Sequence, residues 1–146
     1  MPPQAGQSFD SLAADLEETG ALGDARRRRV FMLRLVERLP LSSAETGWLE
    51  TARHYADGTA TEADLVAARV DAWNSLEGRS CNFADPAVNR TRAVICTLFP
   101  DSEPEEGLDQ IMNVEEFFVD AGGEEHQAVE LLNAVFRAVN SVSAII

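Results

Sequence analysis

The amino-acid sequence predicts an all-α fold: a single domain of about seven helices, arranged as antiparallel helical hairpins in a bundle. Apolar residues recur every three or four positions along most of the chain, and Pro or Gly interrupts this pattern at regular intervals. No segment alternates convincingly as a half-buried strand would, and the tail Val142–Ile146 is the only possible strand. We expect residues 8–146 to form the domain and residues 1–7 to be a disordered tail.

The first two helices are predicted from their capping residues and chain breakers. Ser8 precedes a helix expected over Phe9–Glu18. Asp24 caps a second helix that ends before Pro40, because proline cannot continue a helix. The apolar residues are Phe9, Leu12, Ala13 and Leu16 in the first helix, and Val30, Phe31, Met32, Leu33, Leu35 and Val36 in the second.

Two capping-box patterns, Ser42–Glu45 and Thr61–Asp64, mark the starts of the third and fourth helices. We expect these helices to end at Gly58 and Gly78. Because the loop between them is very short, residues 43–77 are predicted to form an antiparallel helical hairpin. The buried face of the third helix is expected to contain Trp48, Ala52 and Tyr55, and the fourth helix carries Leu65, Val66, Arg69, Val70, Trp73 and Leu76.

Three more helices are predicted in the second half of the chain. Asp85-Pro86 supplies the N-cap and the first-turn proline of a fifth helix that ends before Pro100. An acidic linker over residues 101–107 leads into a sixth helix that ends at Gly122, and a seventh is expected over Glu124–Asn140. Their apolar residues are Val88, Val94, Ile95, Leu98 and Phe99; Leu108, Ile111, Met112, Phe118 and Val119; and Val129, Leu132, Val135, Phe136 and Val139.

Acidic residues are concentrated in the last third of the chain. Thr97–Ile146 contains eleven Asp or Glu and one basic residue, Arg137, whereas Met1–Cys96 contains fourteen acids and eleven arginines. The net charge of −13 disfavours binding to nucleic acid or to an anionic membrane, because both carry charge of the same sign. The partners that this charge favours are a cationic protein, a polyamine or a metal ion, and a basic protein is the one we expect.

Seven acidic residues around the sixth helix are the candidate partner-binding residues. Those near the helix N-terminus are stabilised by the helix dipole, but those in its middle and at its end are not. A solvated surface is the alternative interpretation of the same charges. The candidates are Glu103, Glu105, Glu106, Asp109, Glu115, Glu116 and Asp120.

No catalytic, cofactor-binding or metal-binding signature accompanies these charges, and we expect neither enzyme activity nor a cofactor. Counted from Asp101 as a calcium loop, the linker has Glu106 where Gly is required and Met112 where Glu is required. Cys81 and Cys96 show no CxxC spacing, and the position of Cys96 is typical of a core residue.

The two histidines are interpreted as members of surface pairs. His54 lies four residues from Glu50, and His126 lies four residues from Glu130, so that each pair shares a helix face. Metal ligands would need the same spacing, but the carboxylate-bridged di-iron pattern requires Glu and His three residues apart together with further inward glutamates. The sequence therefore predicts no metal site.

Two further features are interpreted as structural. The run Arg26–Arg29 points in several directions around a helix and has nearby acids, so we expect an internal ion-pair seam rather than a basic patch for nucleic acid. Trp48 and Trp73 are expected in the core of the hairpin, with an exposed anchor for a partner as the alternative.

The segment Trp48–Arg69 resembles a helical hairpin of a helical family of immunity proteins that accompany secreted polymorphic toxins. The likeness lies chiefly in Ala52, Gly58, Thr61 and Ala68, which serve capping and close packing. The resemblance implies a small cytoplasmic inhibitor that binds a cognate toxin and blocks its active site. It identifies no interface residues.

The leading functional hypothesis is a cytoplasmic, non-enzymatic immunity protein that neutralises a basic toxin domain. Because every basic side chain is Arg, a bacterial origin with a GC-rich genome is expected. The segment preceding Ser8 has no signal-peptide pattern, and no stretch has the length of a membrane span. The alternative is a helical scaffold that forms a homo-oligomer without a toxin partner.

Overall fold

A computed structural model of the protein describes residues 6–137 and confirms the predicted all-α fold, with no strand in that range. No helix among these residues is both long and apolar enough to cross a membrane. The predicted strand at 142–146, the end of the seventh helix and most of the predicted tail lie outside the described residues. The elements are α1 (Phe9–Glu18), η1 (Ala21–Gly23), α2 (Ala25–Val36), α3 (Ser43–Ala56), α4 (Glu62–Ser75), α5 (Pro86–Cys96), η2 (Pro104–Glu106), α6 (Gly107–Asp120) and α7 (Glu125–Arg137).

The first five helices begin where the sequence places their caps. In the capping box of α3, Glu45 donates its backbone N–H to Ser42 Oγ at 3.1 Å, and Ser42 donates its N–H to the Glu45 carboxylate at 2.9 Å. Thr61 and Asp64 form the equivalent box at the start of α4. The N-caps of α1, α2 and α5 are Ser8, Asp24 and Asp85.

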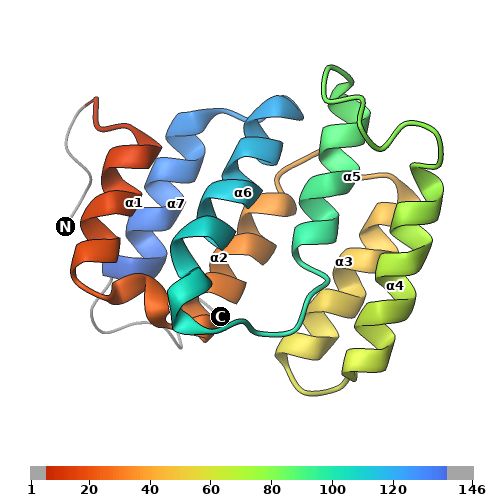
Figure 1. Cartoon of the computed structure of the whole chain (residues 1–146), viewed down its shortest axis with the longest axis horizontal. Coiled ribbons are helices and arrows are strands. Elements are labelled where there is room, and N and C mark those ends of the chain that lie inside the picture. Colours follow the sequence, from red (N-terminus) through yellow and green to blue (C-terminus); the bar gives the residue numbers. More distant parts are fainter. Residues whose placement is uncertain (1–5, 138–146) are drawn as a thin grey trace.

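The helices form two groups that meet where α5 packs against α6 (Figure 1). One group contains α1, α2, α6 and α7, and the other contains the α3–α4 hairpin together with α5. In this view α2 lies behind α6, and α3 lies behind α4 and α5. The predicted antiparallel hairpin is confirmed, and one continuous apolar core runs through both groups.

The buried faces of α3 and α4 differ from the prediction. Leu49 and Ala52 form the buried side of α3, so Trp48 is only partly buried. In α4 the buried side consists of one leucine and two alanines, with Leu76 just beyond the helix, and Trp73 is 38% exposed. The expectation that Trp73 lies in the core was wrong, because the stripe that contains Leu65 faces the core and the stripe of Val66, Val70 and Trp73 faces outward.

Two buried arginines of α2 hold the linker between α5 and α6. Arg29 forms the predicted ion pair, with its Nε 3.0 Å from the Asp101 carboxylate. Arg28, which is 1% exposed, donates instead to neutral oxygens: the carbonyls of Leu22 and Ser102, at 2.7 and 2.8 Å, and a side-chain amide of α6 at 2.8 Å. The predicted ion-pair seam is therefore correct for Arg29 and for Arg27, which pairs with Asp24 at 3.5 Å. It is wrong for Arg26, which forms no ion pair in the described range, and for Arg28, whose charge is compensated by carbonyl dipoles.

The capping residue Glu45 also ties α3 to α5. Its buried carboxylate accepts a hydrogen bond from Arg90 at 2.7 Å and another from Thr91 at 2.6 Å. Burial alone would raise the pKa of Glu45, but hydrogen bonds from the Ser42 backbone, Thr91 and Arg90, with the charge of Arg90, keep that pKa below its usual value. The carboxylate is thus held ionised between the two helices.

Gly107 begins α6 at a point of close backbone approach. A Cβ atom there would lie 2.3 Å from the carbonyl oxygen of Leu22 and 3.3 Å from Nη1 of Arg28. We expect Gly107→Ala to lower the free energy of unfolding by about 1–3 kcal/mol, because the backbone must shift to remove the overlap.

The matched control for this substitution is Gly47→Ala in the exposed middle of α3, where a Cβ would meet no atom within 4 Å. This variant is expected to be about 0.5–1 kcal/mol more stable than the original protein, because alanine favours the helix. Urea unfolding of both variants measures the two effects. Equal behaviour of the two alanine variants would contradict the close approach at Gly107.

Candidate functional site

The structure divides the seven predicted acidic residues into two sets at opposite ends of α6. We call Glu103, Glu105, Glu106 and Asp109, around its N-terminus, the linker acids. At the other end, Asp10 of α1 and Glu125 of α7 add their negative charges to Glu115, Glu116 and Asp120, and these five residues form the acidic cluster. None of the seven predicted residues forms an ion pair with an arginine in the described range. Sequence reasoning missed Asp10 because it lies at the far end of the chain.

Glu115 lies at the centre of the acidic cluster and has a strongly shifted pKa. Partial burial, together with the negative charges of Glu125, Asp10, Glu116 and Asp120, raises its pKa from 4.5 to about 7. Because the folded-state pKa is the higher one, protonation of Glu115 stabilises the fold. That stabilisation is complete below pH 4.5 and is lost as the pH rises through about 7.

We therefore expect Glu115→Gln, which resembles the protonated side chain, to raise the free energy of unfolding at pH 8. After allowance for solvent screening, the expected gain is about 1–2 kcal/mol. Near pH 4 the two proteins should be equally stable. Denaturant unfolding at both pH values measures the difference, and a gain of the same size at pH 4 would contradict the cost of ionising the partly buried Glu115 as the cause.

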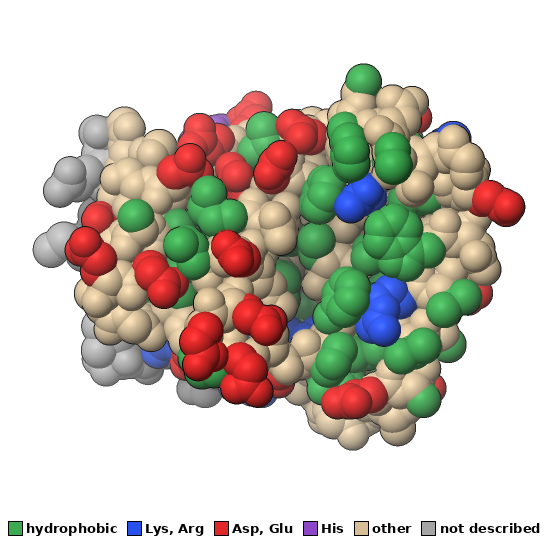
Figure 2. Space-filling model, in the orientation of Figure 1, with side chains coloured by type: hydrophobic (Ala, Val, Ile, Leu, Met, Phe, Trp, Pro, Cys, Tyr) green, Lys and Arg blue, Asp and Glu red, His purple; other side chains and the backbone are tan. Residues whose placement is uncertain are grey.

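Exposed apolar side chains lie close together on the part of the surface formed by α4, α5 and the segments that flank α5. Trp73 projects from α4, Phe83 lies in the loop before α5, and Phe99 follows α5; all three are exposed. In the view of Figure 2, acidic side chains lie over α1, α6 and α7, and the apolar side chains lie over α4 and α5. The aromatic–arginine patch consists of Val66, Arg69, Val70, Trp73, Phe83, Arg92, Phe99 and Phe117.

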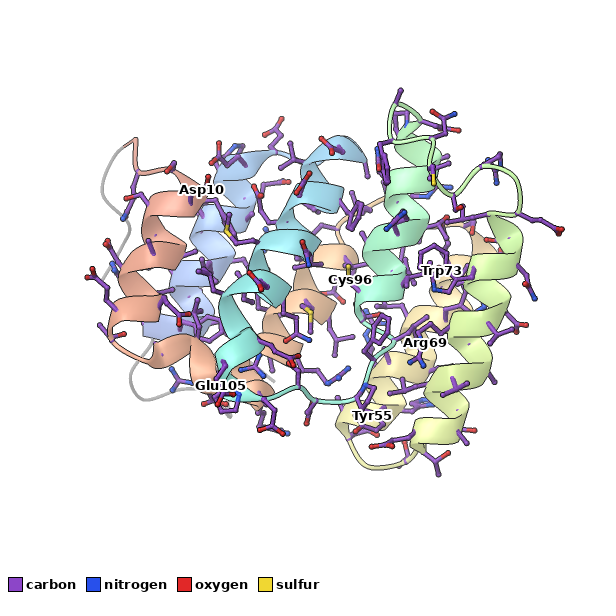
Figure 3. The ribbon with its side chains drawn as sticks, viewed as in Figure 1. Asp10, Tyr55, Arg69, Trp73, Cys96 and Glu105 are labelled. Atoms are coloured by element: carbon purple, nitrogen blue, oxygen red, sulfur yellow. The ribbon has the colours of Figure 1, made fainter. Side chains whose placement is uncertain are left out.

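Two arginines form cation–π contacts with the aromatic rings of this patch. The guanidinium carbon of Arg92 lies 4.8–5.1 Å from the ring centroids of Trp73, Phe83 and Phe117. Arg69 lies 4.4 Å from the Phe99 ring centroid and also donates to the Leu98 carbonyl (Figure 3). Such cation–π contacts hold the rings in place while leaving part of their surface open to a partner.

A signal for this patch was present in the sequence of α4. Val66, Val70 and Trp73 recur at helical spacing beside a second stripe made of Leu65, Ala68, Ala72 and Leu76. A helix at the edge of a two-layer arrangement buries only one stripe, so one of the two had to face outward. The exposed-anchor alternative for Trp73 agrees with this arrangement.

The histidines and cysteines form no shared site. His54 lies 3.9 Å from Glu50, as predicted, but His126 pairs at 3.2 Å with Glu124 rather than with Glu130. No group of three or more potential metal ligands occurs among the residues that the structure describes.

The two thiols occupy different surroundings. Burial raises the pKa of the Cys96 thiol to about 12, so it is not a thiolate near neutral pH, and the nearby charge of Arg92 offsets only part of this effect. Cys81 is exposed in the loop before α5. The surroundings of Cys96 are therefore not those of an activated cysteine nucleophile.

No family model, curated protein or solved structure matches this chain. The likeness of Trp48–Arg69 to immunity proteins therefore stays a prediction.

Proposed function

We propose that this protein is a non-enzymatic binding module that takes a basic protein partner on the face shown in Figure 2. The observation that carries the proposal is the presence of the aromatic–arginine patch and the acidic residues on one face. Tryptophan and arginine are enriched among the few residues that dominate binding energy at protein interfaces, and carboxylates without an arginine partner attract a cationic protein and orient it.

The clustered negative charge of the free protein also favours binding of a cationic group. Partial burial of Glu115, and then the negative charges of the other four carboxylates of the acidic cluster, raise the pKa of Glu115. Lysine or arginine side chains of a partner would relieve the repulsion between these charges, and binding would then release a proton near neutral pH. The linker acids would extend the negatively charged surface that faces the partner along α6.

We further propose that the basic partner is a toxin domain and that this protein is its immunity protein. The resemblance of Trp48–Arg69 to immunity proteins supports this class, and the acidity supports it independently. A homo-oligomeric scaffold is the second candidate, because an exposed apolar patch also suits a second copy of the chain. The charge of −13 on every copy opposes such self-association.

The experiment is affinity purification of the tagged protein from the cells that encode it, at low and at high salt, followed by light scattering. The proposal expects one basic protein that is retained in part at high salt, since the apolar contacts are not screened. A defined homo-oligomer without a second protein would favour the scaffold. A monomer without a partner would contradict both functions.

A further inference from the structure

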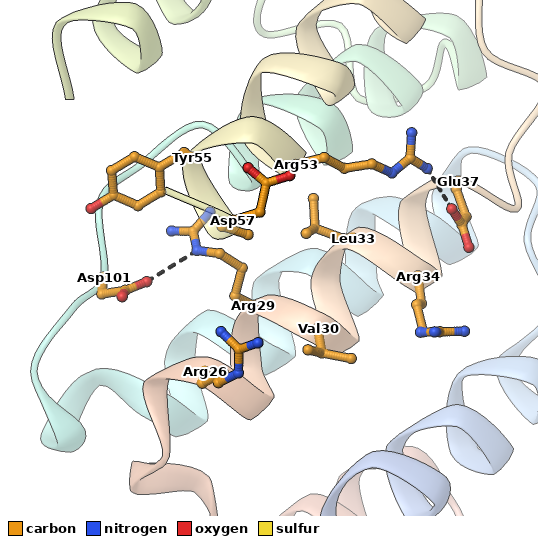
Figure 4. Close-up of a pocket in the computed structure, with 11 residues that line it drawn as sticks. Arg26, Arg29, Val30, Leu33, Arg34, Glu37, Arg53, Tyr55, Asp57 and Asp101 are labelled. Atoms are coloured by element: carbon orange, nitrogen blue, oxygen red, sulfur yellow. Dashed lines mark hydrogen bonds and ion pairs between the residues drawn. The ribbon is translucent and has the colours of Figure 1, made fainter. Parts of the chain in front are cut away.

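A cavity of about 370 Å³ opens between α2 and the C-terminal end of α3, with Asp101 of the linker at its edge (Figure 4). Its floor includes Val30 and Leu33 of α2, and Tyr55 of α3 forms part of its wall. This volume lies within the range of small-molecule sites. The cavity shares no residue with the aromatic–arginine patch, the acidic cluster or the linker acids.

The charge of the cavity wall is opposite to that of the protein. Four of the twelve arginines line it, Arg26, Arg29, Arg34 and Arg53, against only three of the twenty-five acids. In a chain of net charge −13, the wall of this cavity carries a small positive charge. If the charged residues of so acidic a chain were placed at random, acids would outnumber arginines in this wall.

The four arginines have different partners. Arg29 is bonded to Asp101 and Arg53 to Glu37, so acidic side chains already hold these two guanidinium groups (Figure 4). Arg26 and Arg34 have no hydrogen bond or ion pair with any residue in the described range. Their guanidinium groups are therefore the two in this wall that no acid of the described residues pairs with.

The spacing of the arginines along α2 indicates which chemical groups a ligand of this cavity would have. Arg26 and Arg34 each lie four residues from Val30, on one side of α2, so that an apolar surface separates two free guanidinium groups. Guanidinium groups recognise phosphate and carboxylate through paired N–H donors. The apolar floor would cover the body of a ligand whose anionic group lies at the rim.

We propose that this cavity is a binding site for a small organic anion, a phosphate or carboxylate attached to an apolar body, whose anionic group is held by Arg26 or by Arg34 at either end of the apolar floor. This site is independent of the proposed protein-binding face, and either can fail without the other. Asp57, also in the wall, keeps a second anionic group away from the α3 side.

The test is an NMR titration of the full chain with phenyl phosphate and benzoate, with inorganic phosphate and benzylamine as comparison probes. We expect at least one of the two aryl anions to give saturable shifts at the amides of Val30, Leu33 and Ala56. The double substitution Arg26→Gln/Arg34→Gln should weaken its binding about tenfold or more. Inorganic phosphate should bind more weakly, because it lacks the apolar body, and benzylamine should not bind.

The matched control is Arg38→Gln/Arg79→Gln, which removes two exposed arginines outside the cavity and gives the same change in net charge. Its affinity for the aryl anion should stay within about twofold of the original protein. The proposal is overturned if neither aryl anion binds more tightly than about 10 mM, if benzylamine binds equally well, or if both double variants lose the same affinity.

Discussion

Replacing Arg28 by methionine is expected to lower the free energy of unfolding by about 3–5 kcal/mol. The guanidinium of Arg28 is buried and donates hydrogen bonds to the backbone carbonyls of Leu22 and Ser102. Because these acceptors belong to the backbone, they remain in place when the Arg28 side chain is replaced. Methionine fills a similar volume but leaves these carbonyls buried without a donor. Urea unfolding followed by circular dichroism measures the loss.

Two controls separate this effect from the loss of a positive charge. Arg28→Lys keeps the charge but cannot reach all the acceptors with one ammonium group, so an intermediate loss is expected. Arg34→Met removes a partly exposed arginine of the same helix and should change stability by no more than about 0.5 kcal/mol. A loss below about 1 kcal/mol for Arg28→Met would show that the buried guanidinium does not hold the linker in place.

The second large effect concerns association with the basic partner. Reversing three charges, in the variant Glu115→Lys/Glu116→Lys/Asp120→Lys, is expected to slow association about tenfold or more at low salt and to weaken its dependence on salt. The fold should persist, because Glu116 and Asp120 are exposed and the substitution removes the repulsion around Glu115. Stopped-flow or surface-based kinetics at several salt concentrations measure the rate.

A matched triple variant tests whether position matters or only net charge. Glu17, Glu18 and Asp71 are exposed acids outside both acidic sets, and their side chains make no ion pair with a described arginine. Their reversal to lysine changes the net charge by the same amount and should slow association far less. If the two triple variants slow association equally, the acidic cluster has no particular role in the interface.

Much of the fold was predictable because helix boundaries are set locally. A capping box such as Ser42 with Glu45 needs only residues three positions apart, and the sequence displays it directly. Which apolar stripe of α4 faces inward depends instead on how the hairpin packs on α5. Sequence spacing alone therefore placed Trp73 in the core, and the structure places it at the surface.

The site was predictable only in part, for the same reason. The acids of α6 are neighbours in sequence, but Asp10 and Glu125 join them through the packing of α1 and α7. Arg28 resembled its neighbours in a run of four arginines, yet its partners are neutral oxygens from distant segments. Contacts between residues far apart in sequence carry no local pattern, and the chain has no matching relative from which to infer them.

The affinity of the Trp73→Ala variant for the co-purified basic protein tests most directly whether the face in Figure 2 binds the partner. Trp48→Ala is the control, because Trp48 lies on α3, outside the patch, and packs more deeply against the core. We expect Trp73→Ala to weaken binding about thirtyfold or more, and Trp48→Ala to leave it within about threefold. Equal affinities of the Trp73→Ala variant and the original protein would contradict binding of the partner on this face.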